Sequence, residues 1–406
     1  MTTRPLRILM ISDVYFPRVN GVSTSIRTFR RELQALGHSV TLIAPEYPGD
    51  NTADADIIRI GSRGVPMDPE DRMMRRTAID ALSPMLKQKQ FDVLHIHTPF
   101  IAHYAGLYLA KALNIPVVES YHTFFEEYLY HYVPLLPRAL LRLLARRVTV
   151  SQCNAVQQVI APSRAMQDAL RNYGVQADIT ILPTGLEASQ FKLGDGARFR
   201  ARHGIEINRP ALLYVGRVAH EKNIDFLVHC FKQVHAALPD ALLMIVGEGP
   251  ALPHLRALTE RLELKQAVKF IGYLDRDTEL LDCYRAGDIF VFASRTETQG
   301  LVLLEALAQG TPVVSTMHMG TRDVLHNTHG TRIVGEDQTE FAQACIALLR
   351  DKAARKQLAD NATQDAQRWS SQEMAERLVS LYESLLNEGG ATADDQSAPI
   401  SMRAAI

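Results

Sequence analysis

Residues 289–316 read IFVFASRTETQGLVLLEALAQGTPVVST. The short apolar stretch Ile289–Ser294 predicts a buried strand, and Leu301–Ala308 predicts a helix after a polar loop. A second short apolar stretch, Val313–Thr316, follows the helix. A strand, a helix and a strand in this order are typical of a parallel α/β sheet.

The same alternation extends outward from this unit and restarts once along the chain. Other strands are predicted at Leu6–Ser12, Val40–Ala44, Val93–His97, Val117–Tyr121, Leu212–Gly216, Leu242–Gly247 and Val268–Gly272. After the first of them, Ser23 is expected to cap a helix. The pattern predicts an α/β protein with two doubly wound, Rossmann-like domains that face a central cleft. We expect an N-terminal domain at 1–188, a C-terminal domain at 189–370, and a disordered tail at 387–406, which is rich in small and polar residues.

Composition agrees with two globular domains. The chain has 406 residues, of which 47% are hydrophobic and 22% charged. The four cysteines are far apart, so neither a disulfide framework nor a zinc site is expected, and a reducing compartment fits. No stretch of about 18 apolar residues predicts a membrane span. Residues 1–205 hold 24 Lys and Arg against 18 Asp and Glu, a net of +6, whereas the remainder carries −7; chance and an anionic partner both explain this asymmetry.

The loop between Ile289–Ser294 and Leu301–Ala308 is the strongest candidate site. Two acids stand on either side of Gly300: Glu297 in the loop and Glu305 in the predicted helix. Glycine allows a ligand to approach the backbone, and the amides of Leu301 and Val302 at the helix N-terminus suit a phosphate. Glu305, one turn into the helix, is placed to accept hydrogen bonds from a ribose diol, and Glu297 to reach sugar hydroxyls. Read singly, each acid is more often a helix cap or a solvated side chain, and only the combination of the two acids with the glycine is specific.

Two cations follow the first predicted strand of the second domain. Arg217 offers a planar fork and Lys222 a compact charge, which together can clamp a diphosphate. Cations are unfavourable near a helix N-terminus, so their position indicates an anion nearby. The alternative is two exposed basic residues.

The first domain contributes further candidates. His122 ends the strand Val117–Tyr121 and is expected to contact the transferred sugar or the acceptor, although a single histidine is more often a packing residue. Glu126, Tyr128 and His131 follow it and are candidates for an acceptor pocket.

A basic, leucine-rich segment lies at 134–150. Its arginines are Arg138, Arg142, Arg146 and Arg147, and no acid occurs from Tyr128 to Gln167. An amphipathic helix with Arg on one side and Leu on the other lies well in an anionic membrane interface. A core-facing helix with solvated arginines is the alternative.

Other chemistries have weak signals. No P-loop and no G-x-G-x-x-G follows the first strand. His95 and His97 point the same way on a strand, but no third metal ligand is evident.

Together these residues resemble the retaining glycosyltransferases of family 4, which have the two-domain GT-B fold, and the resemblance runs from Ile8 to about Leu386. It implies that Glu297 lies near the donor sugar and Glu305 at the nucleotide ribose, with Arg217 and Lys222 on the phosphates. It also implies that Gly21 approaches the donor phosphate and that His122 lies beside the sugar. A C-terminal helix, 371–386 here, usually returns to the first domain. The donor is a nucleoside diphosphate sugar, and neither a metal nor another cofactor is implied.

One departure narrows the expectation. Many members have Phe before the glycine where this chain has Gln299, which, with Tyr121-His-Thr, is similar to the branch that glucosylates diacylglycerol. We therefore expect hexose transfer, from UDP-glucose, to a membrane lipid by an enzyme peripheral to the inner face of the cell membrane. The alternatives are a soluble transferase acting on a sugar, sugar phosphate or oligosaccharide (for example a mannosyltransferase), an epimerase or phosphorylase-like enzyme, and a non-catalytic binding module. No nucleic acid is expected, and the sequence leaves the oligomeric state open.

Overall fold

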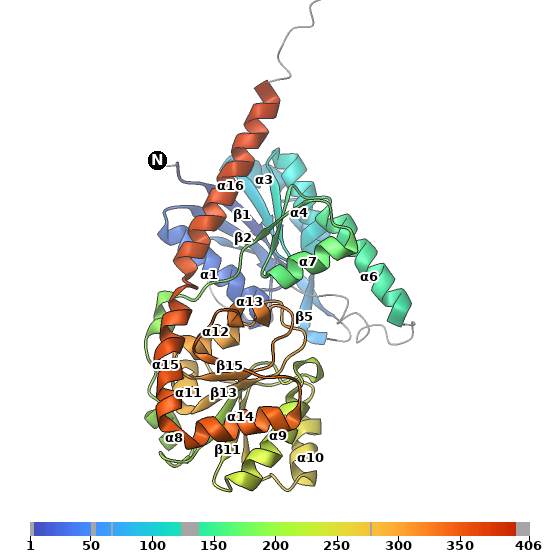
Figure 1. The fold of residues 1–406 in the computed structure, drawn as a ribbon. Coiled ribbons are helices and arrows are strands. Elements are labelled where there is room, and N and C mark those ends of the chain that lie inside the picture. The colour runs from blue at the N-terminus through green and yellow to red at the C-terminus, as the bar shows by residue number, and fades with distance from the viewer. Residues whose placement is uncertain (1–3, 50–53, 66–67, 123–137, 277, 395–406) are drawn as a thin grey trace, which may run out of the picture. The chain divides into compact units, whose positions relative to one another are not determined.

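The computed structural model describes residues 4–49, 54–65, 68–122, 138–276 and 278–394, which form two compact units (Figure 1). Unit 1 comprises residues 1–162, 167–182 and 372–406, and unit 2 comprises 163–166 and 183–371. Each unit is built on its own parallel sheet.

The sheet of unit 1 has the strand order β3-β2-β1-β6-β7-β8-β9. Its strands are β1 (Arg7–Ile11), β2 (Ser39–Pro45), β3 (Ile57–Ile60), β6 (Val93–Ile96), β7 (Val117–Ser120), β8 (Gln158–Ala161) and β9 (Asp178–Ile181). All of them run parallel, with Ile8 opposite both Val40 and Val93. A separate antiparallel ribbon, β4 (Ser62–Val65) with β5 (Asp68–Met74), was not expected from the sequence.

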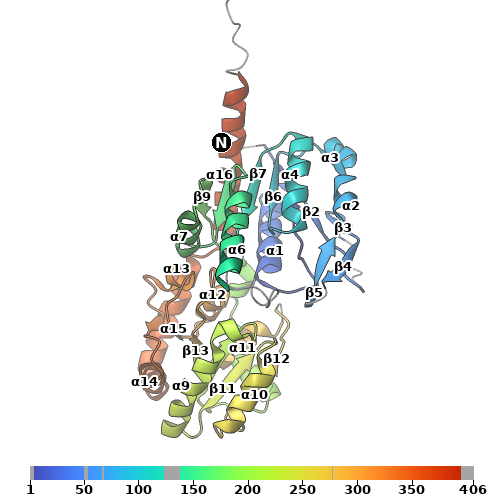
Figure 2. The same ribbon diagram turned by 90° about the vertical axis from the view of Figure 1, so that its right-hand side faces the viewer.

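Helices cover both faces of this sheet (Figure 2). They are α1 (Gly21–Ala35), α2 (Arg76–Asp80), α3 (Ser83–Lys89), α4 (Ile101–Leu113), α6 (Arg138–Cys153), α7 (Arg164–Tyr173) and α16 (Ser371–Asp394). Helices α1 and α16 bury their apolar stripes against one face of the sheet. Helix α4 packs on the other face, where Gly106 lies directly over Ile96. Successive side chains of each strand point to opposite faces of the sheet and thus pack against two layers of helices.

The last helix, α16, joins the core of unit 1 although it follows unit 2 in the chain. Met374, Leu378 and Tyr382, spaced four residues apart, lie on one face of α16 and are almost completely buried. The helix runs to Asp394, beyond Asn387, where the sequence predicts that order ends. Residues 387–394 include Glu388, Ala391 and Ala393, which favour helix, but also Gly389 and Gly390, which do not, so propensity alone does not explain the longer element. The rest of the expected tail, 395–406, lies outside the described residues.

The sheet of unit 2 has the order β12-β11-β10-β13-β14-β15 and is also parallel. Its strands are β10 (Ala211–Val215), β11 (Leu242–Val246), β12 (Val268–Gly272), β13 (Ile289–Phe292), β14 (Val313–Ser315) and β15 (Thr331–Ile333). The five strands expected in this domain match β10 to β14 within one or two residues.

The helices of unit 2 form one layer on each face of its sheet (Figure 1). They are α8 (Gly196–Arg202), α9 (Ile224–Ala237), α10 (Leu252–Arg261), α11 (Leu280–Ala286), α12 (Leu301–Ala308), α13 (Thr321–Leu325), α14 (Gln338–Arg350) and α15 (Lys352–Gln367), with short 3-10 turns at Ala188–Phe191 and His220–Lys222. The opening stretch 289–316 forms β13, α12 and β14, as predicted.

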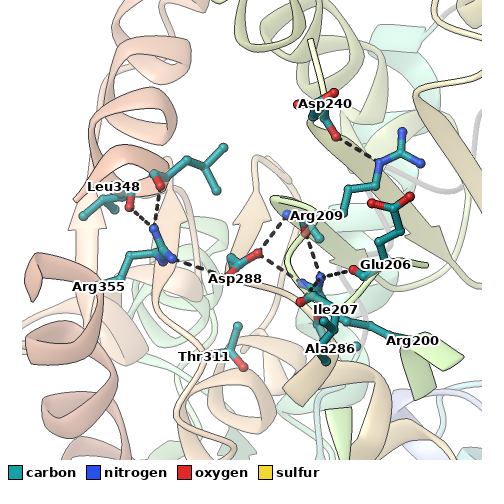
Figure 3. Close-up of polar contacts among 12 residues, drawn as sticks. Arg200, Glu206, Ile207, Arg209, Asp240, Ala286, Asp288, Thr311, Leu348 and Arg355 are labelled. Atoms are coloured by element: carbon teal, nitrogen blue, oxygen red, sulfur yellow. Dashed lines mark hydrogen bonds and ion pairs between the residues drawn. The ribbon is translucent and has the colours of Figure 1, made fainter. Parts of the chain in front are cut away.

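An ion-pair network holds the amino ends of two strands of unit 2 (Figure 3). The carboxylate of Asp288, just before β13, accepts a hydrogen bond from the amide of Ala211 at 2.9 Å and one from Arg200 at 3.1 Å. Arg355 of α15 lies 3.6 Å from the other oxygen. Arg200 also donates to the carbonyl oxygens of Ala286 and Arg209. The network fixes α8 and α15 to the sheet at the edge opposite the candidate site.

All four cysteines are free and buried. Within the described parts of the chain, no helix combines the length and the apolarity needed to cross a membrane.

Candidate functional site

The strand order of unit 2 reverses between β10 and β13, because β11 lies on one side of β10 and β13 on the other. In doubly wound sheets, ligands bind beyond the carboxyl ends of the strands at such a reversal. The loops that follow these two strands carry Arg217, Lys222 and Glu297. The topology therefore gathers the residues singled out in the sequence at one edge of the sheet.

Lys222 and Glu297 form an ion pair, with 2.6 Å between Nζ and Oε1. Their side chains are 14% and 17% exposed, so the pair is only partly screened by water. Asn223 supports it from the next position, because its side-chain amide donates to the carbonyl of Ala293 at 3.2 Å. That bond ties the loop of Lys222 to the end of β13, which leads to Glu297.

Arg217 follows Gly216 at the end of β10 and is exposed. Among the described residues, nothing forms a hydrogen bond or ion pair with its guanidinium group. The backbone beneath it is tightly packed: a Cβ at Gly247, where φ is +122°, would lie 2.0 Å from the carbonyl oxygen of Gly216. A tightly packed backbone thus places an exposed cation at the switch point of the sheet.

Helix α12 begins next to Glu297. Gly300 caps it with φ at +90°, and Leu301 and Val302 are its first residues. The first amides of a helix have no intrahelical carbonyl partner, so they remain suited to an anion. Gln299, which the sequence comparison singles out, has a structural part: its side-chain amide accepts from the amide of Thr184 at 2.9 Å and donates to the carbonyl of that residue at 2.6 Å.

Glu305 is almost completely buried, at 2% exposure. Tyr284 donates to one carboxylate oxygen at 2.7 Å, and the other pairs with Arg276 and accepts from Gln190 at 3.4 Å. The sequence predicts that this acid faces a ribose, but it gives no indication of these three partners. They are distant in sequence and carry no local pattern, so only the fold brings them together.

A further residue that the sequence did not suggest holds the loop between β13 and α12. The amide of Gly320 donates to the carbonyl of Glu297 at 2.8 Å. A Cβ at this position would lie 2.0 Å from the carbonyl oxygen of Thr298. Glycine is therefore required where the two loops cross.

In unit 1, Gly21 is the first residue of α1 and is exposed. A Cβ there would have no atom within 4 Å, so packing does not demand glycine. The helix cap is Asn20, not the expected Ser23. Asn20 accepts from the amide of Ser23, and the Ser23 hydroxyl accepts in return from the amide of Asn20, which is a capping box.

His122 lies after β7 and is partly exposed, with its Nε2 atom 3.2 Å from Nδ1 of His97. Burial lowers the pKa of His122 to about 4.

Nearby, Asp13 follows β1 and accepts from Thr98 at 2.8 Å and from the amide of Ala102 at 3.1 Å. Burial raises the pKa of Asp13 to about 6.

The acceptor candidates Glu126, Tyr128 and His131 lie outside the described residues. Helix α6 begins at Arg138, and Arg142, Arg146 and Arg147 are exposed on it. The expected separation of arginines from leucines is wrong. Leu141 and Ala145 face the core, and the outward surface carries both arginines and the apolar side chains of Leu140, Leu143, Leu144 and Val148, which are 42–48% exposed.

Among the residues that the structure describes, no three His, Cys, Asp or Glu side chains are grouped to hold an ion.

Comparison with known proteins gives these features a family. Residues 19–190 match the family described as Glycosyltransferase Family 4, and residues 195–365 match Glycosyl transferases group 1. The chain is 35% identical over 320 residues to an alpha-monoglucosyldiacylglycerol synthase of Streptococcus pneumoniae, covering 76% of this chain and 71% of that one. This chain belongs to glycosyltransferase family 4.

Two further relatives of this family 4 enzyme have the same name in one case and a different name in the other. An alpha-monoglucosyldiacylglycerol synthase of Acholeplasma laidlawii is 28% identical over 318 residues, covering 76% of this chain and 80% of that one. A GDP-mannose-dependent alpha-mannosyltransferase of Corynebacterium glutamicum is 26% identical over 331 residues, covering 80% and 75%.

The solved structure of HepE from Anabaena, in complex with UDP and glucose, superposes with a TM-score of 0.73 at 18% identity, covering 93% of this chain and all of that one. The GT-B fold expected for the family 4 enzyme is thereby confirmed. As a member of this family it is a retaining glycosyltransferase whose donor is a nucleotide sugar.

Proposed function

We propose that this enzyme transfers glucose from UDP-glucose to a hydroxyl group of a membrane lipid such as diacylglycerol, with retention at the anomeric carbon. The observation that carries the lipid acceptor is the outward surface of α6, where exposed leucines lie among arginines. The names of the relatives from Streptococcus pneumoniae and Acholeplasma laidlawii support the same acceptor.

The α6 surface has the composition of an interfacial helix. Leu140, Leu144 and Val148 are spaced four residues apart and share one face, on which Arg147 also lies. Single exposed apolar side chains are common, but Leu140, Leu143, Leu144 and Val148 are grouped on one helix, and such a patch marks an interaction surface. Leucine inserts at the headgroup boundary, while arginine binds anionic lipid.

Helix α4 extends this surface. Phe100, Tyr104 and Tyr108 are spaced four apart and are 46–58% exposed. Tyr104 adjoins α6, because its hydroxyl accepts from Gln152 of that helix at 3.4 Å. Aromatic side chains of this kind favour the boundary between lipid and water.

In the donor site that we propose, Arg217, Lys222 and the first amides of α12 bind the diphosphate, with Gly21 leaving space beside it. Fixed cations stabilise the charge that accumulates on the departing nucleoside diphosphate. Glu305, oriented by Tyr284, binds the ribose, and Glu297 orients the sugar. The leaving phosphate takes the proton of the acceptor hydroxyl on the same face of the sugar, and His122 contacts that sugar. Unit 1 would bind the acceptor and unit 2 the donor.

Replacing a donor-site cation tests the site. Arg217→Ala and Lys222→Ala should each lose about 2–4 kcal/mol of transition-state stabilisation, or roughly 30- to 1000-fold in kcat/KM. Arg261→Ala, at the end of α10 near the opposite edge of the sheet, serves as the exposed control and should keep full activity. Normal turnover in both site variants would contradict the donor site that we propose.

Vesicle sedimentation tests the acceptor side. The wild-type enzyme should pellet with vesicles that contain phosphatidylglycerol, and less at high salt. Arg147→Gln should weaken binding about fivefold, since a basic residue near an anionic surface contributes about 1 kcal/mol. Leu144→Asn should weaken it as well.

Ile207→Asn in unit 2 is the control, because Ile207 is 61% exposed but lies outside the α6 surface. An enzyme that stays in the supernatant at every salt concentration would favour the alternative, a transferase for a sugar or sugar phosphate. The GDP-mannose-dependent relative motivates that alternative, and assays with UDP-glucose and GDP-mannose against lipid and soluble acceptors separate the two.

A further inference from the structure

Three histidine rings of unit 1 form a continuous stack beside the carboxyl ends of β6 and β7. The rings of His95 and His97 are 4.0 Å apart between centroids, and those of His97 and His122 are 5.5 Å apart and nearly parallel. The donor-site residues of unit 2 have no part in this row. Only His122, at its outer end, enters the proposed reaction.

Hydrogen bonds hold both ends of the row, and ring stacking joins His95 to His97. At the inner end, Nδ1 of His95 lies 2.6 Å from the hydroxyl of Tyr382, and its Nε2 lies 2.8 Å from the hydroxyl of Ser120. At the outer end, Nδ1 of His97 lies 3.2 Å from Nε2 of His122. The remaining nitrogen of His97, Nε2, is buried and has no hydrogen-bond partner among the described residues.

The three rings are neutral near pH 7. Burial lowers the pKa of His95 to about 3 and that of His122 to about 4. Burial, with the neighbouring rings, also lowers the pKa of His97 well below its usual value. A neutral imidazole carries one N–H group, so one nitrogen of the His97–His122 pair must donate and the other must accept.

The buried Nε2 of His97 decides which one donates. If His122 donated from Nε2, the proton of His97 would lie on its own Nε2, as a buried N–H group without an acceptor. Buried N–H groups without partners are rarer in proteins than buried acceptors that lack a donor. The favourable arrangement therefore has His97 donating from Nδ1, which leaves the proton of His122 on Nδ1.

We propose that His97 is a positioning residue that holds His122 in the Nδ1–H form, so that His122 presents a hydrogen-bond donor to an oxygen atom of the bound ligand. The Nδ1 atom of His122 has no partner among the described residues, and its side chain is partly exposed. In this form His122 donates to a sugar or phosphate oxygen and does not act as a base. This last step rests on the proposed function, in which the leaving phosphate takes the acceptor's proton.

Nitrogen NMR of the unliganded, histidine-labelled enzyme tests the assignment directly. The resonances of His122 are identified by their loss in His122→Gln. We expect Nδ1 of His122 to be the protonated nitrogen in the wild type. In His97→Leu, which removes the donor, His122 should change to the other form or to a mixture. A wild-type His122 protonated at Nε2, or an unchanged pattern in His97→Leu, would overturn the proposal.

Kinetics supply the second measurement. His97→Leu should lower kcat/KM about tenfold, the size of one hydrogen bond. His97→Asn should restore most of the loss, because its amide nitrogen replaces the Nδ1 donor. Equal loss in both variants would contradict a positioning role.

His235→Leu is the matched control, since His235 of α9 in unit 2 also has a buried, unpartnered ring nitrogen. It should leave the NMR pattern of His122 and kcat/KM unchanged. Because the wild-type NMR result does not depend on any substrate, it distinguishes a wrong tautomer from a wrong acceptor. It also stands if His97→Leu fails to fold.

Discussion

Gly247, at the end of β11, illustrates how single residues shape the donor site. Its φ of +122° is strained for any other residue, and a Cβ would lie 2.0 Å from a backbone oxygen of Gly216. That oxygen belongs to the residue that precedes Arg217. The absence of a Cβ at Gly247 therefore allows the backbone position from which the proposed phosphate-binding side chain of Arg217 extends.

Gly247→Ala should lower the free energy of unfolding by about 3 kcal/mol, from backbone strain and from the displaced loop. Binding of UDP should weaken with it. Gly272→Ala is the control, since φ is also positive, at +87°, but the nearest atom to a Cβ is 3.8 Å away. Urea unfolding and UDP titration give both quantities, and equal losses in the two variants would show that the contact with Gly216 is unimportant.

At the scale of elements, hydrophobic periodicity was enough to predict the parallel strands, because buried strands in such sheets are short and apolar throughout. The pattern did not reveal the ribbon β4–β5, which is polar and contains no clear alternation. Capping was misplaced by three residues, because Asn20 and Ser23 are both good caps and share one box.

The sequence predicts those site residues that follow a locally recognisable strand. Lys222 and Glu297 follow strand ends that can be recognised locally, and the fold brings them to 2.6 Å. The partners of Glu305 could not be predicted in this way, because Tyr284 and Gln190 reach it through tertiary packing. The arginines and leucines of α6 were identified, but their division between faces depends on which side meets the core.

Asp288 ties β10, α8 and α15 to the start of β13 through the contacts drawn in Figure 3, and its removal should loosen them together. Asp288→Asn should lower the free energy of unfolding by about 2 kcal/mol, because hydrogen bonds to a charged group are lost while Arg200 stays buried. Asp360→Asn is the control on α15, where the Lys356–Asp360 pair is exposed, and it should cost less than about 0.5 kcal/mol. Chemical denaturation measures both; similar small losses would show that the network contributes little.

For the whole molecule, the histidine row makes stability depend on pH. In the folded state the pKa values of His95, His97 and His122 are lowered. Below pH 6.5 these histidines therefore bind protons in the unfolded chain but not in the folded one. Stability should therefore fall as pH falls from 6.5 toward 4, by up to about 1.4 kcal/mol per pH unit for each histidine.

Asp13 acts in the opposite sense. Its pKa is raised from 3.8 to about 6, so its contribution is lost as pH rises across that interval. Asp13→Asn should therefore make the loss of stability on acidification steeper. Urea unfolding between pH 5 and pH 7 measures the slope, and a stability independent of pH in this range would contradict neutral, buried histidines.

The return of α16 to unit 1 has a consequence for biosynthesis. Tyr382 and Leu378 complete the core that β1 and β6 begin, yet nearly the whole chain separates them from those strands. The ribosome must synthesise all of unit 2 before this helix can dock on unit 1. Unit 2 should therefore be able to fold during synthesis before the core of unit 1 is complete.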